Sequence, residues 1–165
     1  MMLKRAVVPF SFASALLVFI NCSDVPAHCS TDVGVYSEEG ANMAPGGDCI
    51  GCHAAGEGPV YQIAGTVMKA PNDDTNCAGI GGAVVRITDA TGAVVDIPTT
   101  TDGNFFYGGD AFRADIPSPI VMPYTAKVLL AGRERSMVQS QTSGDCAGCH
   151  TATGQNGAPG RILAP

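Results

Sequence analysis

The chain has little of what nucleic-acid-binding and membrane-spanning proteins need. It contains no tryptophan, and only 9 lysine and arginine residues stand against 15 acidic ones, without a basic tract. This balance argues against a nucleic acid partner, because the phosphate backbone attracts clustered positive charge. After residue 21 no apolar run is long enough to span a bilayer. Only three histidines are present, so few metal or catalytic sites can be built from them.

The composition favours strands and turns. In 165 residues there are 21 glycines and 11 prolines, and charged residues make up 15%. The length suits one domain with appendages. Without the two basic residues near the start, 7 basic residues remain against 15 acidic ones, a formal charge of −8. Electrostatic steering therefore favours a basic partner protein.

Residues 1–21 have the pattern of an export signal. Lys4 and Arg5 form a positive start, and a mostly apolar run extends from Ala6 to Ile20. The run is short and interrupted by polar residues and proline, which disfavours the alternative of a retained anchor helix. We therefore predict that the chain is exported to an oxidising compartment, the periplasm or the outer membrane, or to the cell surface.

Two cleavage sites remain open. The segment Phe19-Ile20-Asn21-Cys22 resembles a lipobox, the motif that places a lipid on its cysteine, although Asn21 departs from the usual small residue. The alternative is Val25-Pro26-Ala27, which would start the mature chain at His28. We favour lipidation of Cys22, because it directly follows the apolar run; the lipid would then provide the only membrane attachment.

The middle of the chain predicts a β-sandwich. Residues 22–47 are polar and aperiodic, as in a linker, whereas residues 61–138 contain short alternating segments separated by turns. In one of them Val85 and Ile87 share a face opposite Arg86. The six expected strands are Gln62–Val67, Ala83–Thr88, Ala93–Ile97, Asn104–Tyr107, Tyr124–Leu130 and Arg133–Val138. An even number of strands would bring both flanking segments to one end of the sandwich.

Part of this region resembles a known module. The runs Gly65-Thr66-Val67, Ala83 to Asp89 and Thr100 to Phe105 are similar to the carboxypeptidase-regulatory-like sandwich of secreted bacterial proteins. The resemblance covers about half the chain and implies an immunoglobulin-like fold. It says little about function.

Two C-x-x-C-H motifs flank the predicted sandwich. They are Cys49-Ile50-Gly51-Cys52-His53, in residues 48–60, and Cys146-Ala147-Gly148-Cys149-His150, in residues 139–165. Two thiols at this spacing add to the two vinyl groups along one edge of a haem, and the following histidine binds the iron. We predict two haem c groups, with His53 and His150 as proximal ligands. Glycine before the second cysteine would let the backbone approach the macrocycle.

Two alternatives to haem remain. The four cysteines could form one zinc site, or each motif could close as a disulfide. Neither explains the histidine that follows each motif, and an oxidising compartment disfavours a thiolate site.

The repetition extends beyond the motifs, since Gly47 to His53 and Gly144 to His150 differ at one position. A glycine-rich stretch that ends in proline follows each motif. This resembles small soluble c-type cytochromes, in which a proline carbonyl accepts the proton of the proximal histidine. The resemblance implies that Pro59 orients His53 and that Pro159 orients His150; the alternative is that these prolines only shape loops.

The sixth iron ligand is open. His28 is the only other histidine, so both haems cannot have two histidine ligands. Met43 and Met137, which precede the two motifs, are the other candidates, whereas for Met68 and Met122 we expect packing. The remaining thiols, Cys29 and Cys77, are expected to form a disulfide.

The whole chain resembles dihaem or multihaem cytochrome family proteins of Gram-negative bacteria, in which a sandwich is fused to C-x-x-C-H segments. The resemblance implies electron transfer with a redox partner protein. Apart from the haem motifs, the sequence contains no nucleophile elbow or phosphate loop. Two alternatives are a sandwich that binds polysaccharide or a partner cytochrome, with the haems as passengers or sensors, and a haem enzyme with an open iron site.

Overall fold

The computed structural model of the chain describes residues 40–71, 79–108 and 119–165. The predicted export signal, lipid site and disulfide fall outside the described residues, as does one candidate iron ligand. The residues concerned are Cys22, His28, Cys29 and Cys77.

The described chain is mainly β. The strands are β1 Tyr61–Met68, β2 Val84–Thr88, β3 Val94–Pro98, β4 Asn104–Gly108, β5 Thr125–Leu130, β6 Arg133–Ser136 and β7 Ile162–Leu163. Two four-residue helices, α1 Cys49–Cys52 and α2 Cys146–Cys149, contain the cysteine pairs, and a π-helical turn, η1 His53–Glu57, follows α1. All six predicted strands are therefore present, and no bound shifts by more than two residues.

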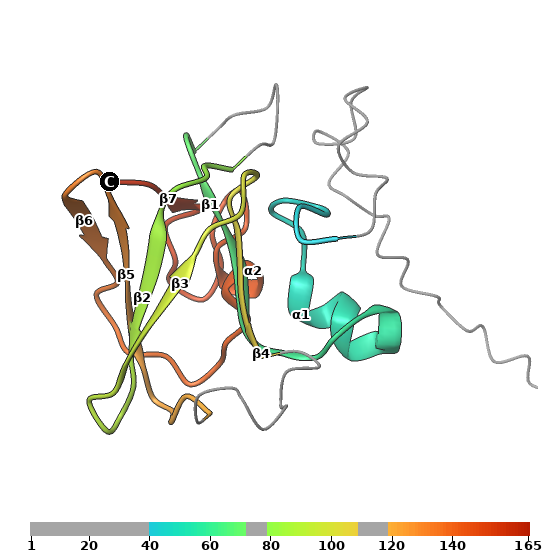
Figure 1. The fold of residues 1–165 in the computed structure, drawn as a ribbon, viewed down its shortest axis with the longest axis horizontal. Helices are drawn as coiled ribbons and strands as arrows, with labels where there is room; N and C mark the ends of the chain where they lie inside the picture. Colours follow the sequence, from blue (N-terminus) through green and yellow to red (C-terminus); the bar gives the residue numbers. More distant parts are fainter. Residues whose placement is uncertain (1–39, 72–78, 109–118) are drawn as a thin grey trace, which may run out of the picture.

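The strands form two sheets, as expected for a β-sandwich (Figure 1). One sheet has the order β4-β1-β7 and the other β3-β2-β5-β6. The pairings are antiparallel except for β7, which pairs parallel to β1 through Val67 and Ile162. Strand β7 was not predicted, because a two-residue strand has no period to detect. The sandwich thus takes in residues beyond 61–138.

The core lies between the sheets and follows the alternation of the strands. Val85 and Ile87 are buried, whereas Arg86 between them faces outward and binds Asp96 of β3 in a salt bridge of 2.6 Å. This confirms the predicted faces of that strand. The full buried cluster is Ile63, Val67, Ala83, Val85, Ile87, Ile97, Phe105, Ile120, Tyr124 and Val128.

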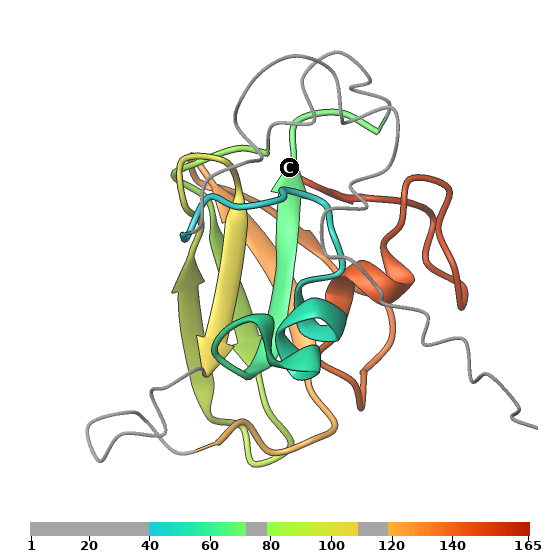
Figure 2. The ribbon, with the colours of Figure 1, turned by 90° about the vertical axis from the view of Figure 1, so that its right-hand side faces the viewer.

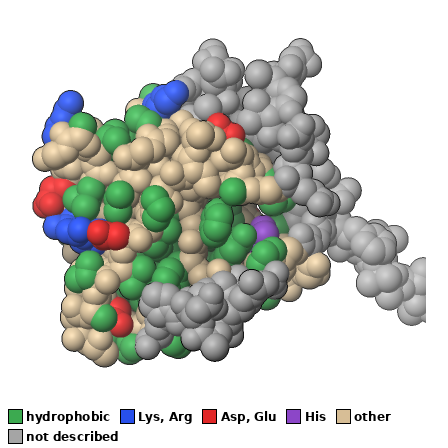
Figure 3. Space-filling model, in the orientation of Figure 1, with side chains coloured by type: hydrophobic (Ala, Val, Ile, Leu, Met, Phe, Trp, Pro, Cys, Tyr) green, Lys and Arg blue, Asp and Glu red, His purple; other side chains and the backbone are tan. Residues whose placement is uncertain are grey.

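Hydrophobic and charged side chains occupy different parts of the surface. Figure 3 shows hydrophobic side chains gathered over the middle of one face, while charged ones gather at its left edge, over β5 and β6. At that edge Lys127 pairs with Glu134 at 2.9 Å. Among the residues described, no helix has the length and hydropathy to cross a membrane.

Both cysteine motifs lie against β1. Helix α1 covers the outer face of β1 and β4, on the side away from the second sheet (Figures 1 and 2). After β6 the chain returns past Tyr124, which exchanges two backbone hydrogen bonds with Gln141, and reaches the edge of β1, where the Ala64 N–H donates to the Gly144 carbonyl at 3.1 Å. Helix α2 starts there. The motifs are therefore neighbours along the side of β1, and not beyond one end of the sandwich as the strand count predicted.

Candidate functional site

Each cysteine pair lies in a short helical turn that starts at an aspartate. The Asp48 carboxylate accepts a hydrogen bond from the Gly51 N–H at 2.8 Å, and Asp145 accepts one from Gly148 at the same distance. The two aspartates have nearly equal backbone angles, with φ and ψ of −77° and 80° in one and −76° and 83° in the other. In a helical turn, residues three apart share a face. The two cysteine side chains of each motif thus start from one side of its turn.

The first histidine has a fixed ring orientation. The Nδ1 atom of His53 lies 2.8 Å from the Pro59 carbonyl oxygen. A carbonyl only accepts, so Nδ1 carries the proton and Nε2 keeps its lone pair for a metal. His53 is 7% exposed, and its ring centroid lies 4.6 Å from the ring centroid of Tyr61. The predicted bond to Pro59 is confirmed.

The second histidine is oriented in the same way by a different residue. The Nδ1 atom of His150 lies 2.7 Å from the Gly160 carbonyl. The prediction of Pro159 is wrong by one position. The loop after His150 is longer than the loop after His53 and contains Gly154 and Gly157 with φ of +77° and +87°. The conformation of such turns decides which carbonyl faces the ring. The position of a proline in the sequence does not decide it.

The motif cysteines differ in state. Cys49, Cys146 and Cys149 have free thiols, whereas Cys52 is disulfide-bonded. Neither motif therefore closes as an internal disulfide. A sulfur engaged in a disulfide cannot add to a vinyl group, so haem attachment at Cys52 requires prior reduction of that bond.

Burial keeps two of the thiols protonated. It raises the pKa of Cys49 to about 11 and that of Cys146 to about 12, because the thiolate is poorly solvated there. Among the described residues, no three histidine, cysteine or acidic side chains converge as metal ligands. The geometry thus gives no support to a zinc site shared by the four cysteines.

The two motifs influence each other electrostatically. The pKa of Cys49 is raised mainly by burial, then by the Asp48 carboxylate and by the Asp145 carboxylate at the start of the second motif. In turn, Cys49 contributes to the raised pKa of Cys146. Such effects require short separations, because solvent and salt screen distant charges. Both motifs also lie beside Ala64 of β1, which lines the cavity next to Cys49 and forms a bridge with Asp145; the neighbouring Gly65 lies next to Cys146.

Tyr124 anchors the second motif and was not singled out by the sequence. It is 2% exposed, and its hydroxyl donates to the Ser143 carbonyl at 2.8 Å and lies 3.9 Å from the Cys146 sulfur. Burial raises the pKa of this phenol far above its usual value. The alternation of β5 indicates that Tyr124 points inward, but a partner 19 residues away leaves no local pattern.

We expect Tyr124→Phe to lower the free energy of unfolding by about 1–2 kcal/mol, because the Ser143 carbonyl loses its donor. Urea denaturation measures this. Val94→Ala, at a side chain that is 56% exposed, is the control and should change stability by less than about 0.5 kcal/mol. Equal stability of Tyr124→Phe and the wild type would show that the hydroxyl does not hold this segment.

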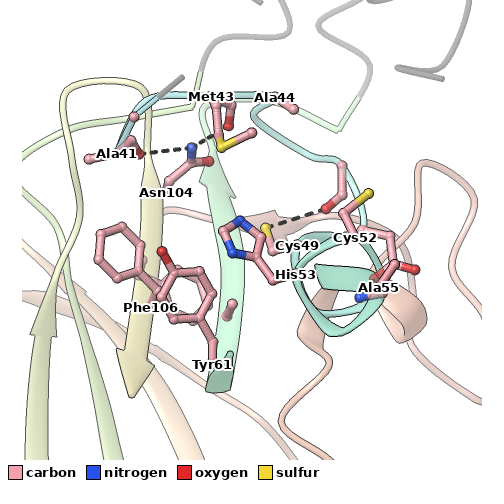
Figure 4. Close-up of a pocket in the computed structure, with 16 residues that line it drawn as sticks. Ala41, Met43, Ala44, Cys49, Cys52, His53, Ala55, Tyr61, Asn104 and Phe106 are labelled. Carbon is pink, nitrogen blue, oxygen red and sulfur yellow. Dashed lines mark hydrogen bonds between the residues drawn. The ribbon is translucent and has the colours of Figure 1, made fainter. Parts of the chain in front are cut away.

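A cavity of about 230 Å³ lies beside the first motif (Figure 4). Its lining includes Met43, Cys49, His53, Tyr61 and Phe106. Its far wall is held to the sheet by a residue that the sequence analysis did not single out, Asn104. The Asn104 amide donates to the carbonyls of Ala41 and Met43 at 3.2 and 2.8 Å, and its oxygen accepts from Thr66 at 2.8 Å.

A larger cavity of about 680 Å³ lies beside the second motif. Its size falls in the range of small-molecule and cofactor sites. Core residues of both sheets line this cavity together with Cys146, Cys149 and His150. Met137 also lines it.

The candidate iron ligands are therefore distributed between the cavities. Met43 shares the first cavity with His53, and Met137 shares the second with His150. Met68 is 2% exposed and Met122 packs against the core, as predicted for these two.

The residues present fit a haem at the second motif, and at the first motif they supply the same kinds of group beside a smaller cavity. Two cysteines of one turn, a histidine with a free Nε2 and an adjacent cavity are the parts that covalent haem attachment needs. The second site has the fuller set, since both of its thiols are free. At the first site the Cys52 disulfide must open first.

Comparisons with known proteins do not extend this picture. No protein-family model, no curated protein and no solved structure matches the chain. The geometry of the two capped motifs is therefore what any functional assignment has to explain.

Proposed function

We propose that the chain is an exported dihaem c-type cytochrome that transfers electrons. Cys49 and Cys52 would hold one haem and Cys146 and Cys149 the other, each through two thioethers. The observation that carries the proposal is the pair of oriented histidines: His53 and His150 each donate from Nδ1 to a backbone carbonyl, which leaves Nε2 for iron.

When bound, the haem iron supplies the change between ferrous and ferric states. The chain's own residues orient the ligand and limit water. The carbonyls of Pro59 and Gly160 hold the rings and strengthen their donor nitrogens. The cavity walls supply mostly apolar contacts, which disfavour added charge and so tune the potential. The acidic net charge favours a basic redox partner.

The optical spectrum of purified protein, oxidised and reduced, tests this function. We expect sharp low-spin c-type bands that respond fully to reduction and that do not change when small ligands are added. A high-spin spectrum with an open iron would contradict the electron carrier and favour the haem enzyme.

Met43 and Met137 are the proposed sixth ligands, because each lines the cavity of one motif. We expect Met137→Ala and Met43→Ala each to remove about half of a methionine–iron charge-transfer band, and the double variant to remove all of it. Met122→Ala is the control, because Met122 packs against the core. A band that survives in the double variant would assign the sixth position to other groups.

The sandwich is proposed to be an immunoglobulin-like, carboxypeptidase-regulatory-like module that brings the two motifs together. Its two sheets and its β1–β4 pairing support this, since the resembling runs fall in β1, β2 and β4.

The proposed location is the periplasm or the outer membrane, through a lipid on Cys22. We expect Cys22→Ala to move the protein from the membrane fraction to the soluble periplasm, because a diacylated cysteine would be its attachment. Fractionation and immunoblotting measure this. A mature chain that starts at His28, or a variant that stays with the membrane, would contradict the lipid.

A further inference from the structure

The aspartate before each motif makes a hydrogen bond that thioether formation and iron binding do not explain. Asp48 and Asp145 are the N-caps of α1 and α2, and each accepts the N–H of the glycine three residues later at 2.8 Å. An N-cap carboxylate satisfies a backbone donor that a short helix would otherwise leave free. The cap therefore acts on the one turn that spaces the two cysteines.

The glycine in each motif is fitted to this cap. A Cβ on Gly51 would lie 2.2 Å from Asp48 Oδ2, and the three nearest atoms it would meet all belong to Asp48. A Cβ on Gly148 would lie 2.1 Å from Asp145 Oδ2, and again the three nearest atoms belong to the aspartate. A side chain at this position would therefore displace the capping carboxylate, which occupies that space. The capping carboxylate thus gives this glycine a role different from the predicted approach to the macrocycle.

We propose that Asp48 and Asp145 are positioning residues for haem attachment, which hold the cysteine turn in the shape that delivers both thiols to one haem edge. The attachment unit is then Asp-Cys-x-Gly-Cys-His, in which the glycine leaves room for the capping carboxylate. This inference rests on the proposed function, because it concerns how the chain receives its haems.

The expected effect follows from the strength of N-caps. Loss of an aspartate cap lowers the equilibrium constant for forming the helical turn by about 2- to 30-fold, the equivalent of 0.5–2 kcal/mol. If attachment proceeds from the formed turn, the attachment rate at that motif falls by the same factor. Haem occupancy of that motif should then drop when haem supply or maturation is limiting.

The two motifs serve as controls for each other. Asp48→Ala should lower haem on the first motif and leave the second unchanged, and Asp145→Ala should do the reverse. Mass spectrometry of proteolytic peptides measures haem at each motif separately. Asp48→Asn and Asp145→Asn keep an acceptor oxygen without the charge and should retain most of the occupancy, since asparagine caps about as well as aspartate. Asp96→Ala, which removes a carboxylate from β3, should change neither motif.

A double-mutant cycle separates the cap from the approach of the macrocycle. Gly51→Ala alone should lower occupancy of the first motif, because its Cβ displaces the capping carboxylate. In an Asp48→Ala background, Gly51→Ala should lower haem occupancy of the first motif only a little further, because the aspartate atoms that its Cβ would meet are absent. A glycine needed for the macrocycle would instead give the full loss in both backgrounds. The cycle of Gly148→Ala with Asp145→Ala repeats the test at the second motif.

The outcomes separate this inference from the proposed function. Wild-type protein without haem would overturn both. Wild-type protein with two haems, together with unchanged occupancy in Asp48→Ala and Asp145→Ala, would overturn the inference alone. Urea denaturation of each variant shows whether it folds. If an aspartate-to-alanine variant does not fold, the aspartate-to-asparagine and glycine-to-alanine variants of the same motif are compared for haem occupancy. Loss of occupancy with asparagine, or unchanged occupancy with glycine-to-alanine, overturns the cap.

Discussion

Replacing Cys146 and Cys149 together by serine is expected to leave one haem per chain where the wild type has two. Both thiols are free and start from one side of the α2 turn, so their removal takes away both thioethers of the second haem. The reduced-haem absorbance per mole of protein should fall by half. The matching Cys49→Ser and Cys52→Ser pair should remove the other half, and the fourfold variant should be colourless.

His53→Ala and His150→Ala complete this series. They keep the thiols but remove the oriented Nε2 donors, so any attached haem should become high-spin. A cysteine-pair variant that keeps two haems, or a fourfold variant that stays coloured, would contradict covalent attachment at these motifs.

The second large effect is expected in the electron paramagnetic resonance of the oxidised protein. We propose that the two haems are neighbours, because both motifs lie against β1 and because Asp145 contributes to the raised pKa of Cys49. Two paramagnetic ferric centres held this close should give a broadened or split signal. Each cysteine-pair variant should give the sharp signal of one isolated ferric haem.

The sum of the two single-haem spectra is the reference for this comparison. A wild-type spectrum that equals this sum would mean two independent centres and would contradict the paired arrangement. Asp96→Ala, which removes a carboxylate from β3, should leave the coupled spectrum unchanged.

The strands could be predicted because their patterns are local. Val85 and Ile87 alternate with Arg86, and the structure buries the first two and exposes the third. The strand β7 could not be found this way, because its two residues owe their conformation to pairing with Val67 and Met68 of β1. Long-range pairing of this kind leaves no periodic trace.

The site was predicted where the chemistry depends on spacing and missed where it depends on tertiary contacts. The cysteine pairs and the Pro59 bond to His53 follow from positions a few residues apart. The bond from Tyr124 to Ser143 and that from Asn104 to Met43 join segments 19 and 61 residues apart. The capping role of Asp48 had a local pattern, an aspartate three residues before a glycine, but the repetition was noted without its physical cause.

The route of the chain between the motifs was also beyond the sequence. Counting strands placed both motifs at one end of the sandwich, but the segment after β6 pairs with Tyr124 and then with Ala64. These bonds lead α2 to the side of β1. Which edge a returning loop chooses depends on the donors left free there, and a strand count does not contain that information.

The intact mass of the mature protein, produced in a host that assembles c-type cytochromes, tests the central claim most directly. We expect the mass of the processed chain plus two haems, stable to denaturation because the thioethers are covalent. A mass with no haem or with one under these conditions would contradict the assignment of both motifs.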